Sequence, residues 1–324
     1  MTEYWWPRPV KDPGGHVTSK LVPKDSAIAI LIFMAVFIIQ FHTGFEPVTD
    51  SRWSVPTALS MIRQGNIDLD EYGSLLKRNR YYMIEIHNDH EYSTYPLGAS
   101  IMALPIVFLA DHQLNPLLRI QPDPGPAGLQ SDPGSAVLDL DSASIQPVLS
   151  GIEAETTALI IALTAVFIFL IGREYLDREN SLLLSFIFAF CTSAWSTGSR
   201  SLMQHGPSMM MLTLALYLLT KAGKNPRLGI IFTHRLLISF LTPDWWGGYS
   251  FGNRFFSDLV PFFVFFLIPV IQFIPKIAGW KQIAFTATFV LLVFASFFIH
   301  IQGANSEDAF LWNAKPADVD RNPS

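Results

Sequence analysis

The stretch that decides the fold is AIAILIFMAVFII (residues 27–39), followed within a few residues by FEPVTDSRW (45–53). Every side chain of the first segment is apolar, and with its neighbours it approaches the ~20 residues that a helix needs to cross hydrocarbon. The second segment carries Glu46, Asp50 and Arg52. The two segments together predict a membrane-spanning helix that ends at a polar site.

The composition of the rest of the chain agrees with a membrane protein. The 324 residues are 50% hydrophobic and 15% charged, with a mean hydropathy of +0.32, and the apolar residues occur in blocks. Such blocks are typical of an all-α polytopic membrane protein. Because no A-x-A-like cleavage site follows the first block, we expect it to be retained as an anchor. Six blocks predict spans: 26–43, 155–172, 181–197, 207–220, 258–275 and 282–301.

A seventh apolar block, residues 95–110, is ambiguous because it is short and contains Pro96 and Pro105. Lys and Arg are enriched in the cytoplasmic connections of membrane proteins. If 95–110 does not cross, the basic residues of the N-terminal tail and of three short connections all lie in the cytoplasm. The residues in those connections are Arg173, Arg178, Lys221, Lys224, Arg227, Lys276 and Lys281. We therefore expect a cytoplasmic N-terminus and an interfacial or re-entrant helix at 95–110.

This topology predicts five regions along the chain. The acidic, Pro/Gly-rich QPDPGPAGLQSDPGS (121–135) predicts a flexible segment within the outer loop. Residues 228–241 must also cross, yet they are short and carry His234 and Arg235, so we expect an irregular segment there. The regions are a cytoplasmic tail (1–25), a first transmembrane helix (26–43), an extracytoplasmic loop (44–154), a transmembrane bundle of about five helices (155–301) and an extracytoplasmic tail (302–324).

The outer loop carries signals for a short helix and a hairpin. Ser54 is placed to cap a helix that has Pro56 in its first turn and Gly65 just past its end. RYYMIEIHNDHEYSTYPLG (80–98) has β-prone ends around a polar turn, which predicts a hairpin. The turn has four ligand-capable side chains, but their spacing matches no closed zinc pattern, so the sequence predicts no metal site. These side chains are His87, Asp89, His90 and Glu91.

Asp50 is the candidate catalytic residue. It lies where the first predicted span meets water. One interpretation is a helix cap or an interfacial charge, for which Asp is well suited. The other is a general base, because a partly desolvated carboxylate can accept a proton from a hydroxyl nucleophile. The residues alone leave both interpretations open.

Two later segments are candidates for binding a phosphate. In WSTGSRSLMQHGPS (195–208), Arg200 and His205 stand beside a predicted helix start, whose free N–H groups and dipole favour anions. In DWWGGYSFGNRFFSD (244–258), glycines permit a tight turn and an arginine supplies a fork-shaped donor. An ordinary helix start and an aromatic belt with a turn are the structural alternatives. The second segment contributes Gly247, Gly248 and Arg254 to the candidate site.

Several motifs occur in a recognisable order. Together they resemble a bacterial branch of the multi-spanning GT-C glycosyltransferases, relatives of the dolichyl-phosphate-mannose-protein mannosyltransferases. The resemblance covers most of the chain from about residue 26, apart from the segment around 121–150. The motifs are TDSRWSVPTALSMIRQGNIDLDEY (49–72), YSTYPLGASIMALP (92–105), SRSLMQHGPSMMMLTLALYLL (199–219), WWGGYSFGNRFFSDLVPF (245–262) and WNAKPADVDRNPS (312–324).

The resemblance implies a GT-C-like helix bundle with amphipathic loop helices, here at 54–64 and 95–110. It implies transfer of a sugar from a polyprenyl-phosphate carrier, on the extracytoplasmic face of a bacterial plasma membrane. Asp50 matches the position of the catalytic carboxylate. The lipid phosphate would be held by polar and basic groups of the outer segments: Arg52, Arg200, His205, Gly247, Gly248 and Arg254.

Two other functions stay open at the level of sequence. The chain has fewer predicted spans than the family it resembles, and a non-catalytic, shortened relative or assembly partner would explain this. A transporter is less favoured because the spans carry few ionisable groups. The expected partners are the lipid-linked sugar donor and membrane lipid, without nucleic acid. No cofactor is indicated, although a divalent metal stays compatible with the chemistry.

Overall fold

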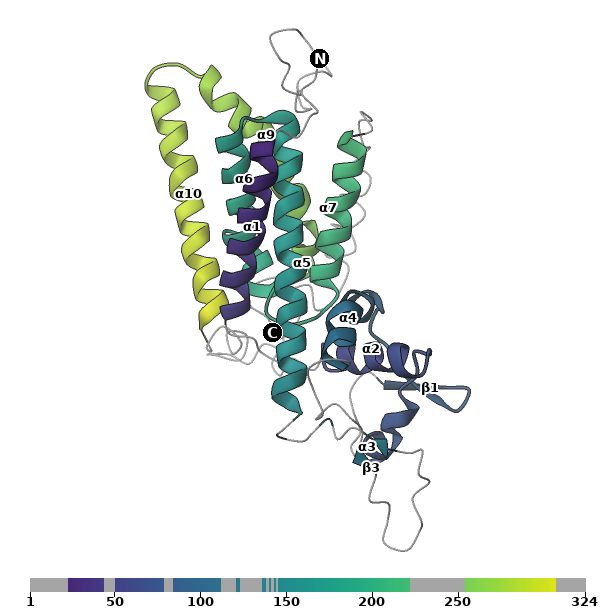
Figure 1. Cartoon of the computed structure of the whole chain (residues 1–324). Helices are drawn as coiled ribbons and strands as arrows, with labels where there is room; N and C mark the ends of the chain where they lie inside the picture. Colours follow the sequence, from purple (N-terminus) through teal and green to yellow (C-terminus); the bar gives the residue numbers. More distant parts are fainter. Residues whose placement is uncertain are drawn as a thin grey trace, which may run out of the picture. The chain divides into compact units, whose positions relative to one another are not determined.

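The computed structural model describes residues 23–43, 50–78, 84–111, 121–122, 136–137, 140, 143, 145–221 and 254–306. The predicted segments 121–135 and 228–241 and the tails lie wholly or mainly outside them. Most described residues are helical, and the chain divides into two compact units (Figure 1). Unit 1 comprises Met1–Gly44, Ala158–Arg200 and His205–Ser324, and unit 2 comprises Phe45–Thr157 and Ser201–Gln204.

Four described helices are long and apolar enough to cross a membrane. They are α1 (Pro23–His42), α5 (Gln146–Tyr175), the helical stretch Phe256–Lys276 that contains α9 (Val260–Phe273), and α10 (Trp280–Asn305). A chain with four such helices has the character of a membrane protein. The predicted all-α class and these four apolar segments are thus confirmed.

The predicted single span at 181–197 is wrong in its extent. α6 (Arg178–Phe190) ends well before residue 197, and a separate turn of π-helix, η4 (Ala194–Gly198), follows it. The Thr192 hydroxyl donates to Phe188 O at 2.6 Å and accepts from Ala194 N at 3.2 Å. A hydroxyl that bonds the local backbone in this way competes with helix continuation. α7 (His205–Lys221) is also shorter than a full span.

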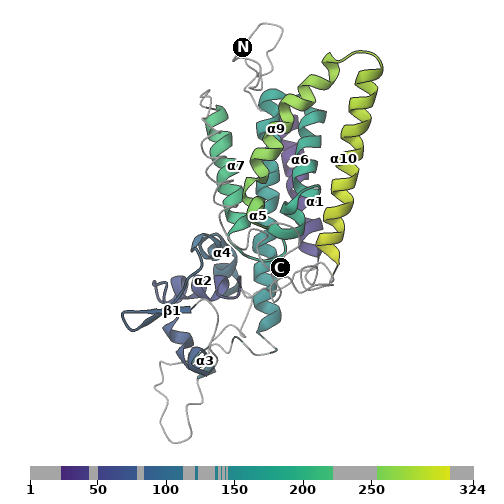
Figure 2. The ribbon, with the colours of Figure 1, turned by 180° about the vertical axis from the view of Figure 1, so that it is seen from behind.

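The helices of unit 1 lie side by side, with α7 and α10 at opposite edges in both views (Figures 1 and 2). Phe169, Phe188 and Phe262 are among its fully buried side chains. By contrast, Leu291 and Phe294 of α10 are each 68% exposed. Apolar exposure on this scale is unfavourable in water and is expected of a surface that faces lipid.

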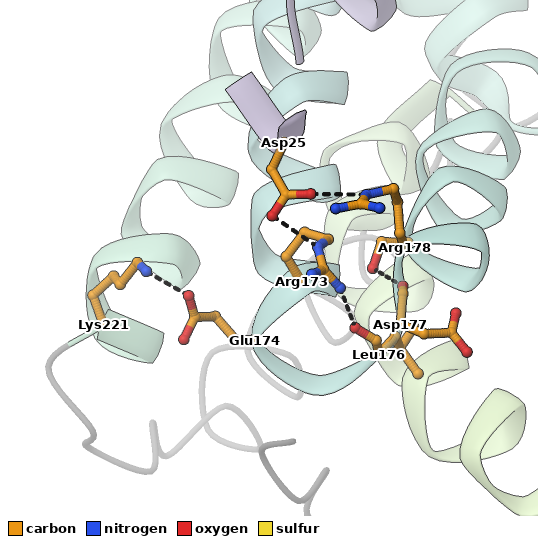
Figure 3. Close-up of polar contacts among 8 residues, drawn as sticks. Asp25, Arg173, Glu174, Leu176, Asp177, Arg178 and Lys221 are labelled. Carbon is orange, nitrogen blue, oxygen red and sulfur yellow. Dashed lines mark hydrogen bonds and ion pairs between the residues drawn. The ribbon is translucent and has the colours of Figure 1, made fainter. Parts of the chain in front are cut away.

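A cluster of charged side chains links the helices at one end of unit 1 (Figure 3). Asp25, in the first turn of α1, lies 3.0 Å from Arg178 Nε and 3.5 Å from Arg173 Nε. Its side chain is only 3% exposed. Lys221 pairs with Glu174 in the same region. The predicted cytoplasmic residues of three connected helices therefore gather at one end of the bundle.

We expect Asp25→Ala to lower the free energy of unfolding by about 2 kcal/mol. Breaking a buried ion pair costs roughly 3–5 kcal/mol, and this value must be discounted because the two arginines are 24% and 38% exposed. Lys221→Ala breaks an exposed pair and should cost less than about 1 kcal/mol. Thermal unfolding in detergent compares the two variants. Equal losses of stability in the two variants would show that the Asp25 ion pairs stabilise the fold no more than the Lys221 pair does.

Unit 2 is built around the packing of α2 (Ser54–Arg63) against α4 (Gly98–Leu109). Ala99, Ala103 and Val107, spaced by four residues, form the buried stripe of α4. At twelve residues α4 is roughly 18 Å long, too short to cross hydrocarbon. That length suits an interfacial helix, and the non-crossing topology stays a prediction.

Smaller elements complete unit 2. They are η1 (Asp70–Tyr72), α3 (Gly73–Arg78), an antiparallel pair of β1 (Ile84–His87) and β2 (His90–Ser93), and a second pair of β3 (Gln121–Pro122) and β4 (Ala136–Val137). The predicted hairpin is confirmed. Asn88 and Asp89 form its turn with φ of +51° and +66°, the left-handed conformation that a two-residue turn requires and that these residue types tolerate.

The predicted cap of α2 is wrong. Trp53 occupies the N-cap position and makes no side-chain cap bond. Ser54 is already inside the helix, and its hydroxyl donates to Leu202 O at 3.0 Å. The Ser54 hydroxyl was expected to cap α2, but it forms a hydrogen bond with a distant residue of unit 2 instead. Gly65, with φ of +74°, does lie just past the end of α2 as expected.

Candidate functional site

Asp50 lies in the turn that leads into α2, and a tyrosine orients its carboxylate. The Tyr95 hydroxyl donates a hydrogen bond to Asp50 Oδ1 at 2.7 Å. Both residues belong to unit 2, and both side chains are half-buried. Tyr95 stands just before α4, so the packing of α4 on α2 holds the phenol close to the turn. A half-buried carboxylate with a fixed orientation has the features of a general base.

The turn that carries Asp50 is itself anchored. Ser51 and Trp53 are 0% and 1% exposed. The Ser51 hydroxyl and the Leu202 backbone N–H donate to Glu153, which is 4% exposed. These contacts lie within unit 2 and restrict the backbone on either side of Arg52. Arg52, half-buried in the same turn, is the predicted phosphate ligand nearest to Asp50 in the chain.

The far end of α2 holds a second polar group. Arg63 pairs with Asp111 Oδ1 at 2.5 Å, and Ser60 donates to Glu71. Burial raises the pKa of Glu71, the Ser60 hydrogen bond opposes this rise, and the charges of Asp68 and Asp70 add to it. Burial also raises the pKa of the adjacent Tyr72 hydroxyl. The ionised form of Glu71 is therefore disfavoured in the folded chain.

This pKa shift predicts a pH-dependent gain in stability for Glu71→Gln. A carboxyl whose folded pKa is raised stabilises the fold fully below its ordinary pKa of 4.5, and the contribution is lost as pH rises through the folded value. At neutral pH the glutamine avoids a desolvated charge, so its melting temperature should exceed that of the wild type.

The same comparison well below pH 4.5 should show no gain, because Glu71 is then protonated. Glu85→Gln, on the exposed face of β1, is the matched control and should change little at either pH. Equal melting temperatures at neutral pH would contradict the prediction, as would a gain that grows on acidification.

His205 is held by a carboxylate that the sequence did not identify. Its Nδ1 lies 2.9 Å from Oδ1 of Asp258 in η5 (Arg254–Leu259), and the two side chains are 2% and 9% exposed. Because a carboxylate only accepts, Nδ1 carries the hydrogen. His205 Nε2 is buried without a hydrogen-bond partner in the described chain. Since the hydrogen on Nδ1 is used by Asp258, His205 could donate to a phosphate only if Nε2 also carried a hydrogen. The sequence did not reveal this requirement.

The remaining predicted phosphate ligands belong to several elements of the chain. Arg200 is 4% exposed and donates to Gly303 O at 3.3 Å, so it ties the end of α10 to the segment after η4. Arg254 is the first residue of η5. Gly247 and Gly248 lie outside the described residues. Arg200, His205 and Arg254 belong to unit 1, whereas Asp50 and Arg52 belong to unit 2.

One group of side chains in unit 2 could hold a metal ion. Asp68, Asp70 and His90 each offer a ligand atom, and these atoms all lie within 4.8 Å of one another. The hydrogen bond that His90 donates to Asp70, together with the charge of Asp70, raises the pKa of His90. Burial opposes ionisation of Asp70, but bonds from the Glu91 backbone and His90 outweigh it and lower its pKa. The two carboxylates therefore give this group of three side chains a negative charge, which favours a cation.

Comparison with known proteins adds no identification. No protein-family model matches the chain, and neither a curated protein nor a solved structure matches it.

Proposed function

We propose that the chain is a membrane glycosyltransferase of GT-C type. It would transfer a sugar from a polyprenyl-phosphate carrier to an acceptor hydroxyl on the extracytoplasmic face of a bacterial plasma membrane. The observation that carries the proposal is the hydrogen bond from Tyr95 to Asp50, in a turn anchored on both sides. A positioned carboxylate just after an apolar helix is what proton removal at the membrane surface requires.

The proposed reaction is a single displacement. Asp50 accepts the proton of the acceptor hydroxyl, and the oxygen attacks the anomeric carbon of the donor sugar. The bond from that carbon to the phosphate oxygen breaks, and the polyprenyl phosphate leaves with the electron pair. Basic groups stabilise the charge that develops on the phosphate, a role assigned to Arg254 and the other predicted ligands. The Asp50 proton then passes to solvent.

The orientation of the chain is part of the proposal. Arg173, Arg178 and Lys221 lie at one end of the bundle, where the Asp25 cluster also lies. Basic residues in short connections favour the cytoplasmic side. That end is therefore assigned to the cytoplasm, which leaves residues 44–154 outside. Labelling of single cysteines introduced at Ser131 and Asn225 tests this: the first should react from outside, the second only from inside.

The function is tested by sugar transfer in membranes that express the chain. Membranes are incubated with radiolabelled polyprenyl-phosphate sugars, including mannosyl and glucosyl donors, and labelled acceptor is measured. Membranes with the same vector and no insert are the control. Transfer that depends on the chain supports the proposal. Well-inserted protein that transfers none of the donors contradicts it.

One observation favours a second candidate, a non-catalytic relative or assembly partner. Among the described residues only four helices are long and apolar enough to cross a membrane, because α6 and α7 are shorter. A bundle with few full-length helices offers less surface to a long lipid carrier. In this case substitutions at Asp50 would alter stability at most.

A further inference from the structure

The start of η1 and the β1–β2 hairpin bring together three side chains that could bind a metal. Asp68 precedes η1, Asp70 is the first residue of η1, and His90 begins β2. One ligand atom from each lies within 4.8 Å of the other two. His90 lies about twenty positions after the two aspartates in the sequence, so the three side chains come together only when the chain folds.

Backbone contacts fix this arrangement. Leu69 N donates to Glu91 O at 2.7 Å, and Glu91 N donates to Asp70 Oδ1 at 2.8 Å. Leu69 is fully buried. The residues that flank Leu69 are therefore pinned beside β2. The bond to Asp70 Oδ1 also orients this carboxylate, as outer contacts commonly do for metal ligands.

Asp68 is the observation that points to a cation. The residue is 8% exposed, and one of its carboxylate oxygens lies within 4.8 Å of a ligand atom of Asp70 and of His90. Across the described chain it makes no hydrogen bond or salt bridge, whereas Asp70 has both His90 and Glu91. A carboxylate that no described donor bonds can accept a cation, and a positive charge beside it would offset its partial loss of solvent. His90, with Nδ1 2.5 Å from Asp70 Oδ2, is bonded to the other carboxylate.

The donor set identifies the class of ion. Two carboxylates and one neutral imidazole carry two negative charges, which match a divalent cation. The imidazole favours transition metals over Mg²⁺ and Ca²⁺, and Zn²⁺ accepts three protein ligands of this kind with a water as the fourth. With ligand bonds of about 2 Å, bound donor atoms lie roughly 3–4 Å apart. An ion would open the 2.5 Å contact between His90 Nδ1 and Asp70 Oδ2 to this spacing.

We propose that Asp68, Asp70 and His90 form a binding site for a divalent transition metal, Zn²⁺ or Mn²⁺. The ion replaces the direct contact between Asp70 and His90 and lies against the Asp68 carboxylate. It acts as a cross-link that joins the start of η1 to the hairpin. The site is independent of the proposed glycosyl transfer, and its test needs no sugar donor.

The test uses the full chain purified in detergent without a polyhistidine tag. The protein is stripped with a chelator and dialysed against Zn²⁺ or Mn²⁺, and bound metal per chain is measured. Wild type and Glu85→Gln, which removes a nearby exposed carboxylate from β1, should bind one equivalent. Asp68→Asn and His90→Gln should each weaken binding about tenfold or more. Metal should raise the melting temperature of the first two proteins only.

Two results would overturn the proposal. One is a wild type that binds neither metal, which would leave an imidazolium at His90 as the partner of both carboxylates. The other is equal binding by all four proteins, which would place the metal elsewhere. If the two ligand variants fail to fold, X-ray absorption of the zinc-loaded wild type decides. One imidazole with oxygen ligands supports the site, and several imidazoles contradict it.

Discussion

Replacing Asp50 by asparagine is expected to lower sugar transfer about 10²–10⁴-fold, the range that a general base contributes. The amide is nearly isosteric with the carboxylate and still accepts the hydrogen bond that Tyr95 donates at 2.7 Å. It cannot take the acceptor's proton. Membrane insertion and expression should therefore equal those of the wild type, which immunoblotting of the membrane fraction checks. Transfer is measured with the radiolabelled polyprenyl-phosphate donors.

Tyr95→Phe separates orientation from proton transfer. The variant keeps the carboxylate and loses one neutral-to-charged hydrogen bond, worth roughly 1.5–3 kcal/mol. Transfer should fall less than in Asp50→Asn. Glu85→Asn, which removes an exposed carboxylate of β1, is the matched control and should transfer normally. Retained transfer by Asp50→Asn would remove the catalytic role from this residue. Equal loss in all three variants would indicate a general defect of unit 2.

Much of the fold was predictable because its signals are local. The apolar block at 27–39 becomes α1, and the polar residues Asn88 and Asp89 form the hairpin turn. The errors arose where a hydroxyl found a partner that local sequence does not specify. Ser54 bonds Leu202 instead of capping α2, and Thr192 bonds the backbone at the end of α6. Propensity and periodicity do not contain such contacts.

The candidate site was predictable only in part, for the same reason. Asp50 was identified because it follows an apolar block. Its partner Tyr95 lies 45 residues further along the chain, and 53 residues separate His205 from Asp258. The metal-capable group was missed because the sequence was read within the hairpin alone. Asp68 joins His90 only when Leu69 bonds Glu91. Nothing in the spacing of these residues predicts their pairing.

Asp258→Ala is expected to lower the free energy of unfolding by about 1–3 kcal/mol, because it leaves a buried hydrogen-bond donor of His205 without its acceptor. The His205 ring is 2% exposed, and its Nε2 already has no hydrogen-bond partner in the described chain. Without Asp258 the Nδ1–H also loses its acceptor. Both ring nitrogens are then buried and unsatisfied. Thermal and denaturant unfolding in detergent measure the loss.

Asp258→Asn distinguishes the lost hydrogen bond from lost packing. The amide oxygen still accepts from His205 Nδ1–H, so the variant should lose only about 1 kcal/mol. A double-mutant cycle with His205→Ala gives the coupling directly, and the double variant should lose clearly less than the two single variants added together. Strict additivity would mean that the 2.9 Å contact contributes nothing to stability. If Asn costs as much as Ala, the charge of Asp258 is what matters, which would require His205 to be an imidazolium in the folded chain. That form carries a hydrogen on Nε2, the donor that phosphate binding by His205 requires.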